Sequence, residues 1–491
     1  MPDIIVSADN YSMLRVKCER GVAAELSEYF SFFVPGYKFM PAYKNKVWDG
    51  KIRLFNQITG ELNTGLIGYL MKFCIERGYT ADVEETEYGI PGLPEKVDTN
   101  AFNDFFLSLN APYDLREYQY NAIIEGLRRK QAVLLSPTGS GKSYIIYCLM
   151  RQILAQTNNK ILVIVPTTSL VEQMYSDFKE YGQDVQNEVH RIYSGKDKTT
   201  NKRVIVSTWQ SIYKFPKKWF EQFDAVFGDE CHGFKSKSLS SIMNKATEAK
   251  WRLGFTGTLD GTQTHQLVLE GLFGPVYNVT MTKKLQDDGH LAPLDIKVIS
   301  LRYSEESRNN LKGATYQTEL DFLVAHEKRN KFITNLTLSL EGNSLVLFRY
   351  VDRHGKQLYD MINSKAQEDR KIFFVHGDVD TSDREAIRKI VEKQSNAVIV
   401  ASLGTFSTGI NIRNLHNIVF ASPSKSQIKV LQSIGRGLRV SEDGRVTQLF
   451  DIADDLSVGK KPNYTLLHSA KRIKMYEDQQ FKYKIVKVDL E

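Results

Sequence analysis

The sequence has few cysteines and no long apolar run, and both shortages exclude classes of protein. Its four cysteines, Cys18, Cys74, Cys148 and Cys231, are widely scattered among 491 residues. This spacing argues against a zinc site, an iron–sulfur cluster or a disulfide framework, and it suits a reducing compartment. No stretch reaches the roughly 18 apolar residues of a membrane span, and the first residues do not resemble a signal peptide. We therefore expect a cytoplasmic protein without membrane contact.

Positive charge exceeds negative charge only slightly, with 65 Lys and Arg residues against 58 Asp and Glu residues. Hydrophobic residues make up 42% and charged residues 25% of the chain, as in an ordinary globular protein. The net charge of +7 suits a polyanionic partner, but many basic proteins bind no nucleic acid, so the charge is weak support. The length allows about three domains of roughly 100–200 residues each.

Glycine and proline are concentrated in EYGIPGLPEK, which divides the chain, because such clusters are typical of linkers. From about Ala132, short apolar runs such as AVLLS, ILVIV and AVFGD alternate with longer amphipathic stretches, which predicts buried parallel strands between helices. The alternation pauses and then resumes with SLVLF, KIFFV, AVIVA and NIVFA. An α/β protein with two tandem parallel-sheet domains is therefore expected. The predicted parts are an α+β accessory domain at 1–88, a linker at 89–112, α/β domains at 113–280 and 341–455, a connecting segment at 281–340, and a basic helical extension at 456–491. The helix of this extension is expected to be followed by a short terminal strand.

A glycine-rich loop follows the strand-like AVLLS and precedes the helix-like YIIYCLMRQIL. In this context Gly139 and Gly141 would let backbone amides surround phosphates, Lys142 would reach the β and γ oxygens of ATP, and Ser143 would hold Mg²⁺. The alternative, a chance glycine turn, is weakened by the strand and helix on either side. The predicted nucleotide-binding residues here are Ser136, Pro137, Thr138, Gly139, Ser140, Gly141, Lys142 and Ser143.

A second polar cluster, DAVFGDECH, follows another apolar strand. Asp229 would coordinate Mg²⁺, and Glu230 would orient and deprotonate the attacking water. An isolated Asp-Glu pair is usually solvated surface, but after a phosphate loop and a buried strand the catalytic interpretation is favoured. We expect His232 to couple this site to the TGT segment, through Thr256 and Thr258.

Two further segments complete the predicted nucleotide site. Gln119, in LREYQ, has an amide that can bond both donor and acceptor edges of adenine, although a surface glutamine is an equal alternative. In QSIGRGLR, Gln432, Arg436 and Arg439 are expected on a helix, where Arg436 and Arg439 share one face. Two guanidiniums in that position would stabilise charge on the γ-phosphate; a solvated basic face is the alternative.

This succession of motifs resembles superfamily two helicases, and DECH, GFTGT and QSIGRGLR are similar to its recombination and repair branch. Over its whole length the chain resembles the recombination helicases of T-even phages. The resemblance implies two RecA-like domains, ATP with Mg²⁺, and a motor acting on branched or double-stranded DNA. Fork regression, Holliday junction branch migration, and dissociation of D-loops and R-loops are the implied activities, so RNA–DNA hybrids are possible partners.

The resemblance also implies DNA contacts. In the first α/β domain they are Pro166, Thr167, Thr208 and Gln210, and in the second the leading candidate is Arg349. Trp209 is either a platform for a base or part of the core. The chain departs from the family pattern at Thr408 and Asn411, where Arg and Asp are common.

Basic and aromatic residues alternate in YKFMPAYKNKVWDGKIRLF, near the N-terminus. Lys44, Lys46, Lys51 and Arg53 beside aromatic planes suit nucleic acid. The aromatics would equally suit a small core with lysines facing solvent.

Three rival functions remain open. A restriction-type motor subunit shares the motifs but needs a nuclease site, and no convincing acidic-plus-lysine cluster is present outside the motor. An RNA helicase is the second, because one sequence does not reveal whether 2′-hydroxyls are read. The third is a DNA-binding or annealing protein without motor activity, which the complete set of motifs disfavours.

Overall fold

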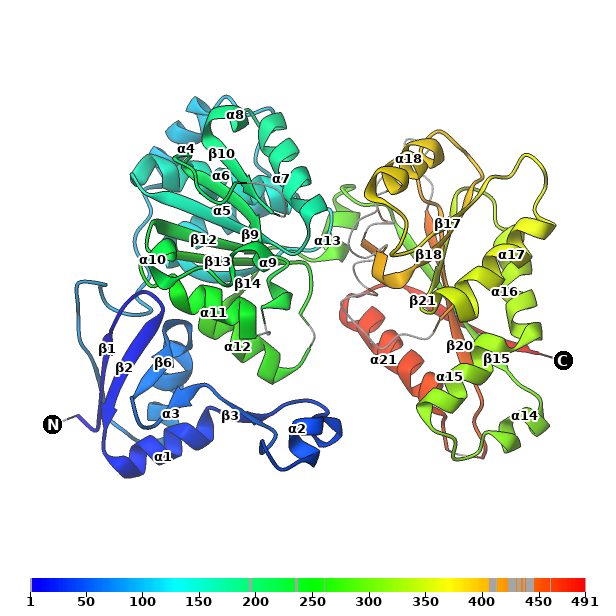
Figure 1. Ribbon diagram of the computed structural model, residues 1–491, viewed down its shortest axis with the longest axis horizontal. Coiled ribbons are helices and arrows are strands. Elements are labelled where there is room, and N and C mark those ends of the chain that lie inside the picture. The colour runs from blue at the N-terminus through cyan, green and yellow to red at the C-terminus, as the bar shows by residue number, and fades with distance from the viewer. Residues whose placement is uncertain are drawn as a thin grey trace. The chain divides into compact units, whose positions relative to one another are not determined.

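The computed structural model describes residues 2–193, 197–234, 237–259, 261–405, 412, 414–422, 430, 434–435, 438, 446–459 and 461–490 (Figure 1). Contacts divide the chain into two units, one of residues 1–136 and 141–279 and the other of residues 137–140 and 280–491. Among the described residues, no helix combines the length and the apolar character that a membrane crossing requires.

The first unit contains a RecA-like sheet of seven described strands, in the order β10-β11-β9-β12-β13-β8-β14. Neighbouring strands are parallel. The inner strands are buried along nearly their whole length, as the apolar runs predict for a sheet with helices on both faces. The strands are β8 (Gln131–Leu135), β9 (Lys160–Val165), β10 (Val189–Ile192), β11 (Val204–Thr208), β12 (Phe223–Asp229), β13 (Trp251–Thr256) and β14 (Val276–Asn278).

The helices of this domain follow the strands in alternation, which confirms the predicted α/β class. Strands β8, β13 and β12 are direct neighbours, so the segments after them emerge together at one edge of the sheet. The helical segments are α5 (Glu117–Arg129), α6 (Lys142–Gln156), α7 (Thr168–Glu180), α8 (Val185–Glu188), α9 (Trp209–Ile212), α10 (Lys217–Phe220), η3 (Cys231–Gly233), α11 (Lys237–Lys245) and α12 (Gln263–Phe273).

The second unit has a further RecA-like sheet of seven described strands, ordered β17-β18-β16-β19-β20-β15-β21. This sheet extends beyond the predicted range of 341–455, because β15 pairs with β20 and β21 pairs with β15. Its strands are β15 (Leu294–Arg302), β16 (Ser344–Phe348), β17 (Ile372–Val375), β18 (Val398–Ser402), β19 (Asn417–Phe420), β20 (Thr447–Asp455) and β21 (Tyr483–Asp489). Its helical segments are α13 (Thr282–Asp287), α14 (Glu305–Asn310), α15 (Tyr316–Ala325), α16 (Glu327–Ser339), η4 (Val351–Gly355), α17 (Lys356–Lys365), α18 (Thr381–Val391) and α21 (Tyr464–Asp478).

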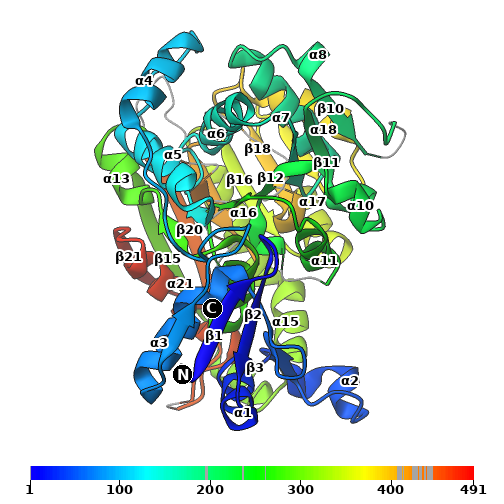
Figure 2. The same ribbon diagram turned by 90° about the vertical axis from the view of Figure 1, so that its left-hand side faces the viewer.

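The accessory domain, residues 1–88, is α+β as predicted, and its main sheet has the order β5-β6-β2-β1-β7. Its strands β1, β2, β5 and β6 are antiparallel, and β7 is parallel to β1. A hairpin, β3 with β4, leads away from this sheet to α2 (Figures 1 and 2). The elements are β1 (Ile4–Ala8), β2 (Met13–Cys18), α1 (Arg20–Tyr29), β3 (Ser31–Phe33), η1 (Tyr37–Phe39), α2 (Pro41–Lys44), β4 (Lys51–Arg53), β5 (Phe55–Asn56), β6 (Glu61–Asn63), η2 (Thr64–Leu66), α3 (Ile67–Arg77) and β7 (Ala81–Val83).

The accessory domain and the first RecA-like domain form one unit, although a linker was predicted between them. The predicted linker, 89–112, contains helix α4 (Thr99–Ser108), whose Phe102 is buried against Tyr120 with ring centroids 5.6 Å apart. Residue Glu95 donates its backbone N–H to the Arg128 carbonyl oxygen at 2.8 Å. The segment is therefore packed along the motor domain.

Candidate functional site

The glycine-rich loop joins the buried strand β8 to helix α6. Its first residue, Ser136, donates its backbone N–H to the Thr256 carbonyl oxygen at 2.8 Å, which attaches the loop to β13. Gly139 and Gly141 have φ of 86° and 79°, in the left-handed region that side chains disfavour. Helix α6 begins at Lys142, so its N-terminal amides follow this turn, as anion binding requires.

Lys142 connects the loop to the DECH segment. Its Nζ lies 2.8 Å from Asp229 Oδ1 and 2.7 Å from Glu230 Oε1. Burial disfavours the ammonium charge, but the attraction of the two carboxylates outweighs it and raises the pKa of Lys142. The structure therefore brings together three side chains that the sequence assigned to phosphate, metal and water.

The two carboxyl groups differ in their surroundings. Burial and repulsion from Glu230 raise the pKa of Asp229, although Lys142 opposes them. For Glu230, burial is outweighed by Lys142 and His232, which together lower its pKa. Glu230 has φ of 49° and donates its backbone N–H to Asp229 Oδ1 at 2.9 Å, so this turn fixes the two side chains relative to each other. Glu230 is therefore ionised in this arrangement, as a proton acceptor must be before it receives a proton.

His232 lies between the DECH and TGT segments, where the sequence predicted a coupling residue. Its Nδ1 is 3.2 Å from Glu230 Oε2 and 3.0 Å from Thr256 Oγ1. The Thr256 hydroxyl is buried and bonds to the Thr258 carbonyl oxygen at 3.0 Å. These contacts give a continuous polar connection from Glu230 to the end of β13.

Gln119 packs against the glycine loop. A Cβ atom on Gly141 would lie 2.3 Å from Gln119 Nε2, so glycine is needed there for this approach as well as for its φ. The Gln119 Oε1 accepts the Arg116 backbone N–H at 3.0 Å in a capping box. This placement fits a nucleotide contact, which stays a prediction.

Two residues at the site belong to no recognised motif, and the sequence analysis did not predict them. Tyr181 places its hydroxyl 2.9 Å from Ser143 Oγ. His265 places Nε2 2.8 Å from the His232 carbonyl oxygen. Tyr181 follows α7 and His265 lies in the first turn of α12. Because the docking of these helices depends on the whole fold, no local pattern indicates either residue.

The predicted DNA contacts of the first RecA-like domain lie after neighbouring strands β9 and β11. Gln210 donates its side-chain N–H to the Pro166 carbonyl oxygen at 3.4 Å, which joins the two segments. Thr167 caps α7, and Thr208 is buried with its hydroxyl 2.9 Å from Ser211 Oγ. Trp209 is half-buried and packs against the domain core. The segments are adjacent, while DNA contact by each residue stays a prediction.

In the second unit, Arg349 follows strand β16 and is exposed. Its guanidinium donates to the Tyr316 hydroxyl at 3.0 Å and lies 5.2 Å from the Tyr350 ring centre. The other predicted residues of this unit, Gln432, Arg436 and Arg439, and the atypical Thr408 and Asn411, lie outside the described residues.

The basic–aromatic segment of the accessory domain combines the two interpretations left open by the sequence. Tyr37 packs on Phe33 and Tyr43, with ring centroids 4.6 and 4.7 Å away, so part of the segment is a small core. Lys44 and Lys46 are exposed. Lys51 lies 5.0 Å from the Phe33 ring centre, and Arg53 pairs with Asp49.

Comparisons with known proteins identify the family. The model described as DNA helicase UvsW, N-terminal, matches residues 3–84; the res subunit of type III restriction enzymes matches 112–261; and the helicase conserved C-terminal domain matches 327–441. The ATP-dependent DNA helicase uvsW of Enterobacteria phage T4 is 36% identical over 516 residues, covering 99% of this chain and 100% of that protein. The chain belongs to the UvsW family of DNA helicases.

Solved structures agree with this assignment. The crystal structure of T4 UvsW covers 100% of both chains at 34% identity, with a TM-score of 0.53. A fragment of an HsdR subunit of a type I restriction enzyme from Vibrio vulnificus YJ016 covers 97% of this chain and 88% of its own, at 17% identity and a TM-score of 0.57, which shows the fold alone. The predicted resemblance, the two RecA-like domains and the class of ATP-dependent helicase are confirmed.

Proposed function

We propose that this chain couples hydrolysis of Mg²⁺-bound ATP to the remodelling of branched or double-stranded DNA. The observation that carries the hydrolysis step is the convergence of Lys142, Asp229 and Glu230 at the carboxyl ends of β8 and β12. In P-loop enzymes these residue types hold phosphate, metal and the attacking water.

The residues fit nucleotide and metal. Lys142 would exchange its two carboxylate partners for β- and γ-phosphate oxygens. A hydroxyl from Ser143 and a carboxylate from Asp229 are oxygen ligands of the kind Mg²⁺ prefers, and the ion would neutralise charge on the phosphates. Glu230, freed from Lys142 and held by its turn, would accept a proton from water, while His232 keeps its carboxylate in place.

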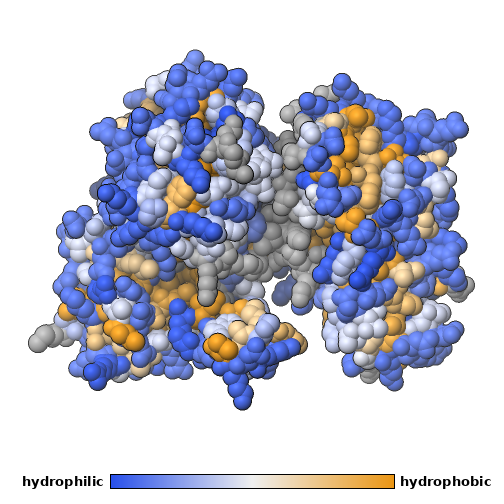
Figure 3. Space-filling model, viewed as in Figure 1, coloured by the Kyte–Doolittle hydropathy of each residue, from blue (hydrophilic) through white to orange (hydrophobic). Residues whose placement is uncertain are grey.

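The accessory domain supports DNA as the substrate. Its projecting segment, which we define as residues 33–53, carries Lys44 and Lys46 together with Phe39 and Val47, which are each 81% exposed. Apolar and hydrophilic surface alternate there in the space-filling view (Figure 3). Cations suit phosphates and exposed aromatic rings suit unpaired bases, a combination available at a DNA branch point.

Branched DNA is the proposed substrate class because T4 UvsW, the relative of nearly full coverage, is described as an ATP-dependent DNA helicase, and the resemblance to T-even phage recombination helicases implies junction remodelling. Fork regression, Holliday junction migration, and D-loop and R-loop dissociation are the proposed activities. Since the predicted contacts are to backbone and branch shape, binding should depend on structure more than on sequence.

The test is ATP hydrolysis and strand separation on a set of substrates of equal base composition: a four-way junction, a fork, a linear duplex, an R-loop and an RNA duplex. We expect ATP-dependent product from the branched substrates and little from the RNA duplex. Stronger unwinding of the RNA duplex would replace DNA by RNA as substrate. Hydrolysis without any strand separation would favour a binding or annealing protein, and cleavage of a closed circular plasmid would favour a restriction-type enzyme.

A further inference from the structure

Helix α12 touches both the predicted hydrolysis site and the accessory domain. It begins shortly after the TGT segment, at Gln263, and ends at Phe273, beside β14. The nucleotide motifs and the DNA-contact predictions use none of its residues. Its first turn nevertheless contacts the DECH segment, and its last turns contact the accessory domain.

The first turn of α12 contacts the DECH segment. His265 is 4% exposed, and because its Nε2 faces the His232 carbonyl oxygen at 2.8 Å, this nitrogen carries the proton and donates. The His232 ring itself contacts Glu230 and Thr256. A displacement of α12 would therefore move the turn that holds the predicted base.

The last turns of α12 are packed into the accessory domain. A Cβ atom on Gly65, in η2, would lie 1.8 Å from the Glu270 carbonyl oxygen and 2.8 Å from the Gly274 nitrogen, so another residue would force the two elements apart. Leu267 is 2% exposed and belongs to the accessory-domain core. Burial, and after it the interaction with the nearby Glu270 carboxylate, raise the pKa of Tyr69.

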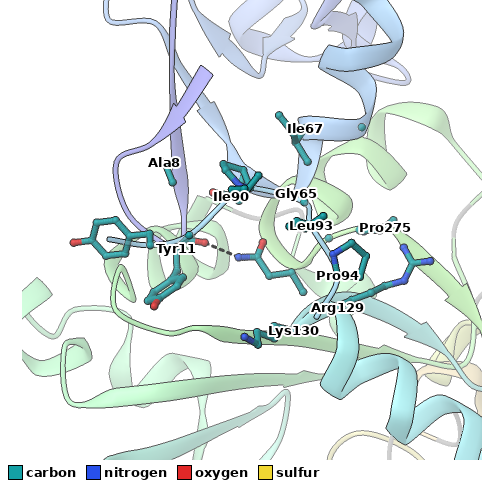
Figure 4. Close-up of a pocket in the computed structure, with 18 of the residues that line it drawn as sticks. Ala8, Tyr11, Gly65, Ile67, Ile90, Leu93, Pro94, Arg129, Lys130 and Pro275 are labelled. Atoms are coloured by element: carbon teal, nitrogen blue, oxygen red, sulfur yellow. Dashed lines mark hydrogen bonds between the residues drawn. The ribbon is translucent and has the colours of Figure 1, made fainter. Parts of the chain in front are cut away.

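A second attachment holds the β1–β2 turn. The buried guanidinium of Arg252 donates to Ser12 Oγ at 3.3 Å and to three carbonyl oxygens of the motor domain, one of them Leu272 at the end of α12. Gln131 donates its side-chain N–H to the Tyr11 carbonyl oxygen at 2.8 Å, drawn as a dashed line in Figure 4. A cavity of about 650 Å³, bordered by Tyr11, Ile67 and Pro275, adjoins both attachments (Figure 4). The packing is open at this cavity, and movement of the accessory domain would reach the motor domain through the two attachments beside it.

We propose that α12 is a coupling helix through which duplex or branched DNA, held by the accessory domain, alters ATP hydrolysis, with His265 as a positioning residue for the Glu230–His232 turn. This inference rests on the proposed function. It adds that the accessory domain acts on the rate of chemistry as well as on DNA affinity. An accessory domain joined to a motor by a free linker would change affinity alone.

The experiment compares Gly65→Ala with Gly68→Ala in the full chain. Position 68 has nothing within 4 Å of an added Cβ, so it is a matched control in the same part of the domain. We expect Gly65→Ala to keep basal hydrolysis within about twofold and to lose about fivefold or more of the stimulation by a four-way junction, the usual size of coupling between sites. Gly68→Ala should behave as wild type. Wild-type stimulation in folded Gly65→Ala protein would overturn the proposal, as would an equal loss of basal and stimulated rates.

Tyr69→Phe provides a milder version, because it removes one hydroxyl and keeps the ring. Like Gly65→Ala, it should lower the stimulation of ATP hydrolysis by the junction, while junction affinity at fixed salt stays within about twofold of wild type. Unchanged stimulation in Tyr69→Phe, together with wild-type behaviour of Gly65→Ala, would contradict the role of α12 as a coupling helix. Failure of the proposed function would look different: wild-type protein itself would show no DNA-stimulated hydrolysis.

His265 is tested by a pair of substitutions. His265→Ala should lower the turnover number at saturating ATP about fivefold or more and leave ATP affinity near wild type, because the contact positions the turn rather than the nucleotide. His265→Gln can place an N–H donor close to the position of Nε2 and should restore most of the rate. Equal behaviour of the two variants would remove His265 from this role.

Discussion

At the residue scale, Lys142 holds together two carboxylates that would otherwise repel. Lys142→Ala should abolish ATP hydrolysis, because the phosphate contact and the counter-charge of Asp229 and Glu230 are lost together. DNA binding should persist, since the predicted DNA contacts lie elsewhere. Phosphate release and junction affinity are the two measurements, with Lys217→Ala, an exposed lysine of α10, as the control. Normal turnover in Lys142→Ala would refute the nucleotide-site assignment.

Glu230→Gln separates binding from chemistry. The amide keeps nearly the same shape but does not accept a proton, so ATP and Mg²⁺ should still bind while hydrolysis slows by about 10²- to 10⁴-fold. Loss of the Glu230 charge also removes the repulsion that helps to raise the pKa of Asp229. Nucleotide titration would measure ATP binding and single-turnover hydrolysis would measure the chemical step, so the two together separate these effects. A wild-type rate of hydrolysis would exclude Glu230 as the base.

The sequence predicted the residues of this site where they form contiguous motifs. Lys142, Asp229 and Glu230 follow apolar strands, and parallel strands place their carboxyl ends along one edge. It did not predict His265 or Tyr181, because their contacts with His232 and Ser143 depend on how α12 and α7 dock.

At the scale of elements, the apolar runs predicted the inner strands of both sheets but not β15, and they did not indicate that the short terminal strand, β21, joins the second sheet. In β15 buried and partly exposed positions mostly alternate, and β21 is largely exposed at the sheet edge. Neither has a continuous apolar run. Their strand conformation depends on pairing with distant residues, as between Leu294 of β15 and Thr447 of β20, which propensity does not encode.

The turn η4 contains a buried histidine that makes stability depend on pH. Burial, with the nearby Arg329 charge, lowers the pKa of His354 to about 3, and its ring nitrogens contact Ser422 and Asn330. Between that value and the ordinary value near 6.5, the unfolded chain binds a proton that the folded chain does not. Its contribution to stability is therefore complete above about pH 6.5 and is lost as pH falls, by up to about 1.4 kcal/mol per unit.

His354→Gln should remove this contribution. The unfolding free energy, measured by denaturant titration at pH 7 and at pH 5, should fall less at the lower pH in the variant than in wild type. The two proteins should differ in this fall by about 2 kcal/mol. The comparison between proteins cancels the other titrating groups. Parallel pH dependence in the two proteins would contradict a neutral buried His354.

For the molecule as a whole, the interpretation of 89–112 as a linker would predict that the chain without residues 1–84 remains a stable ATPase. The structure predicts otherwise, because the deletion would expose Leu267 and remove the Ser12 partner of Arg252. Burial of one leucine stabilises by about 1.5–3 kcal/mol, so the first unit should lose at least about 1.5 kcal/mol. Thermal unfolding of both chains is the measurement, and an unchanged unfolding temperature would mean that the accessory domain is loosely attached.

DNA affinity can be tested without disturbing that attachment, because Lys44 and Lys46 are exposed on the projecting segment and lie apart from α12. The double substitution Lys44→Gln and Lys46→Gln should weaken junction binding and flatten the plot of log affinity against log salt, by about 0.9 per lost duplex phosphate contact. Lys328→Gln with Lys331→Gln, on α16, removes the same charge from an exposed helix and serves as the control. If both pairs change the slope equally, general charge rather than the projecting segment attracts DNA. If the first pair alone changes it while basal hydrolysis stays constant, the accessory domain holds phosphates directly, and DNA bound there is in position to act through α12.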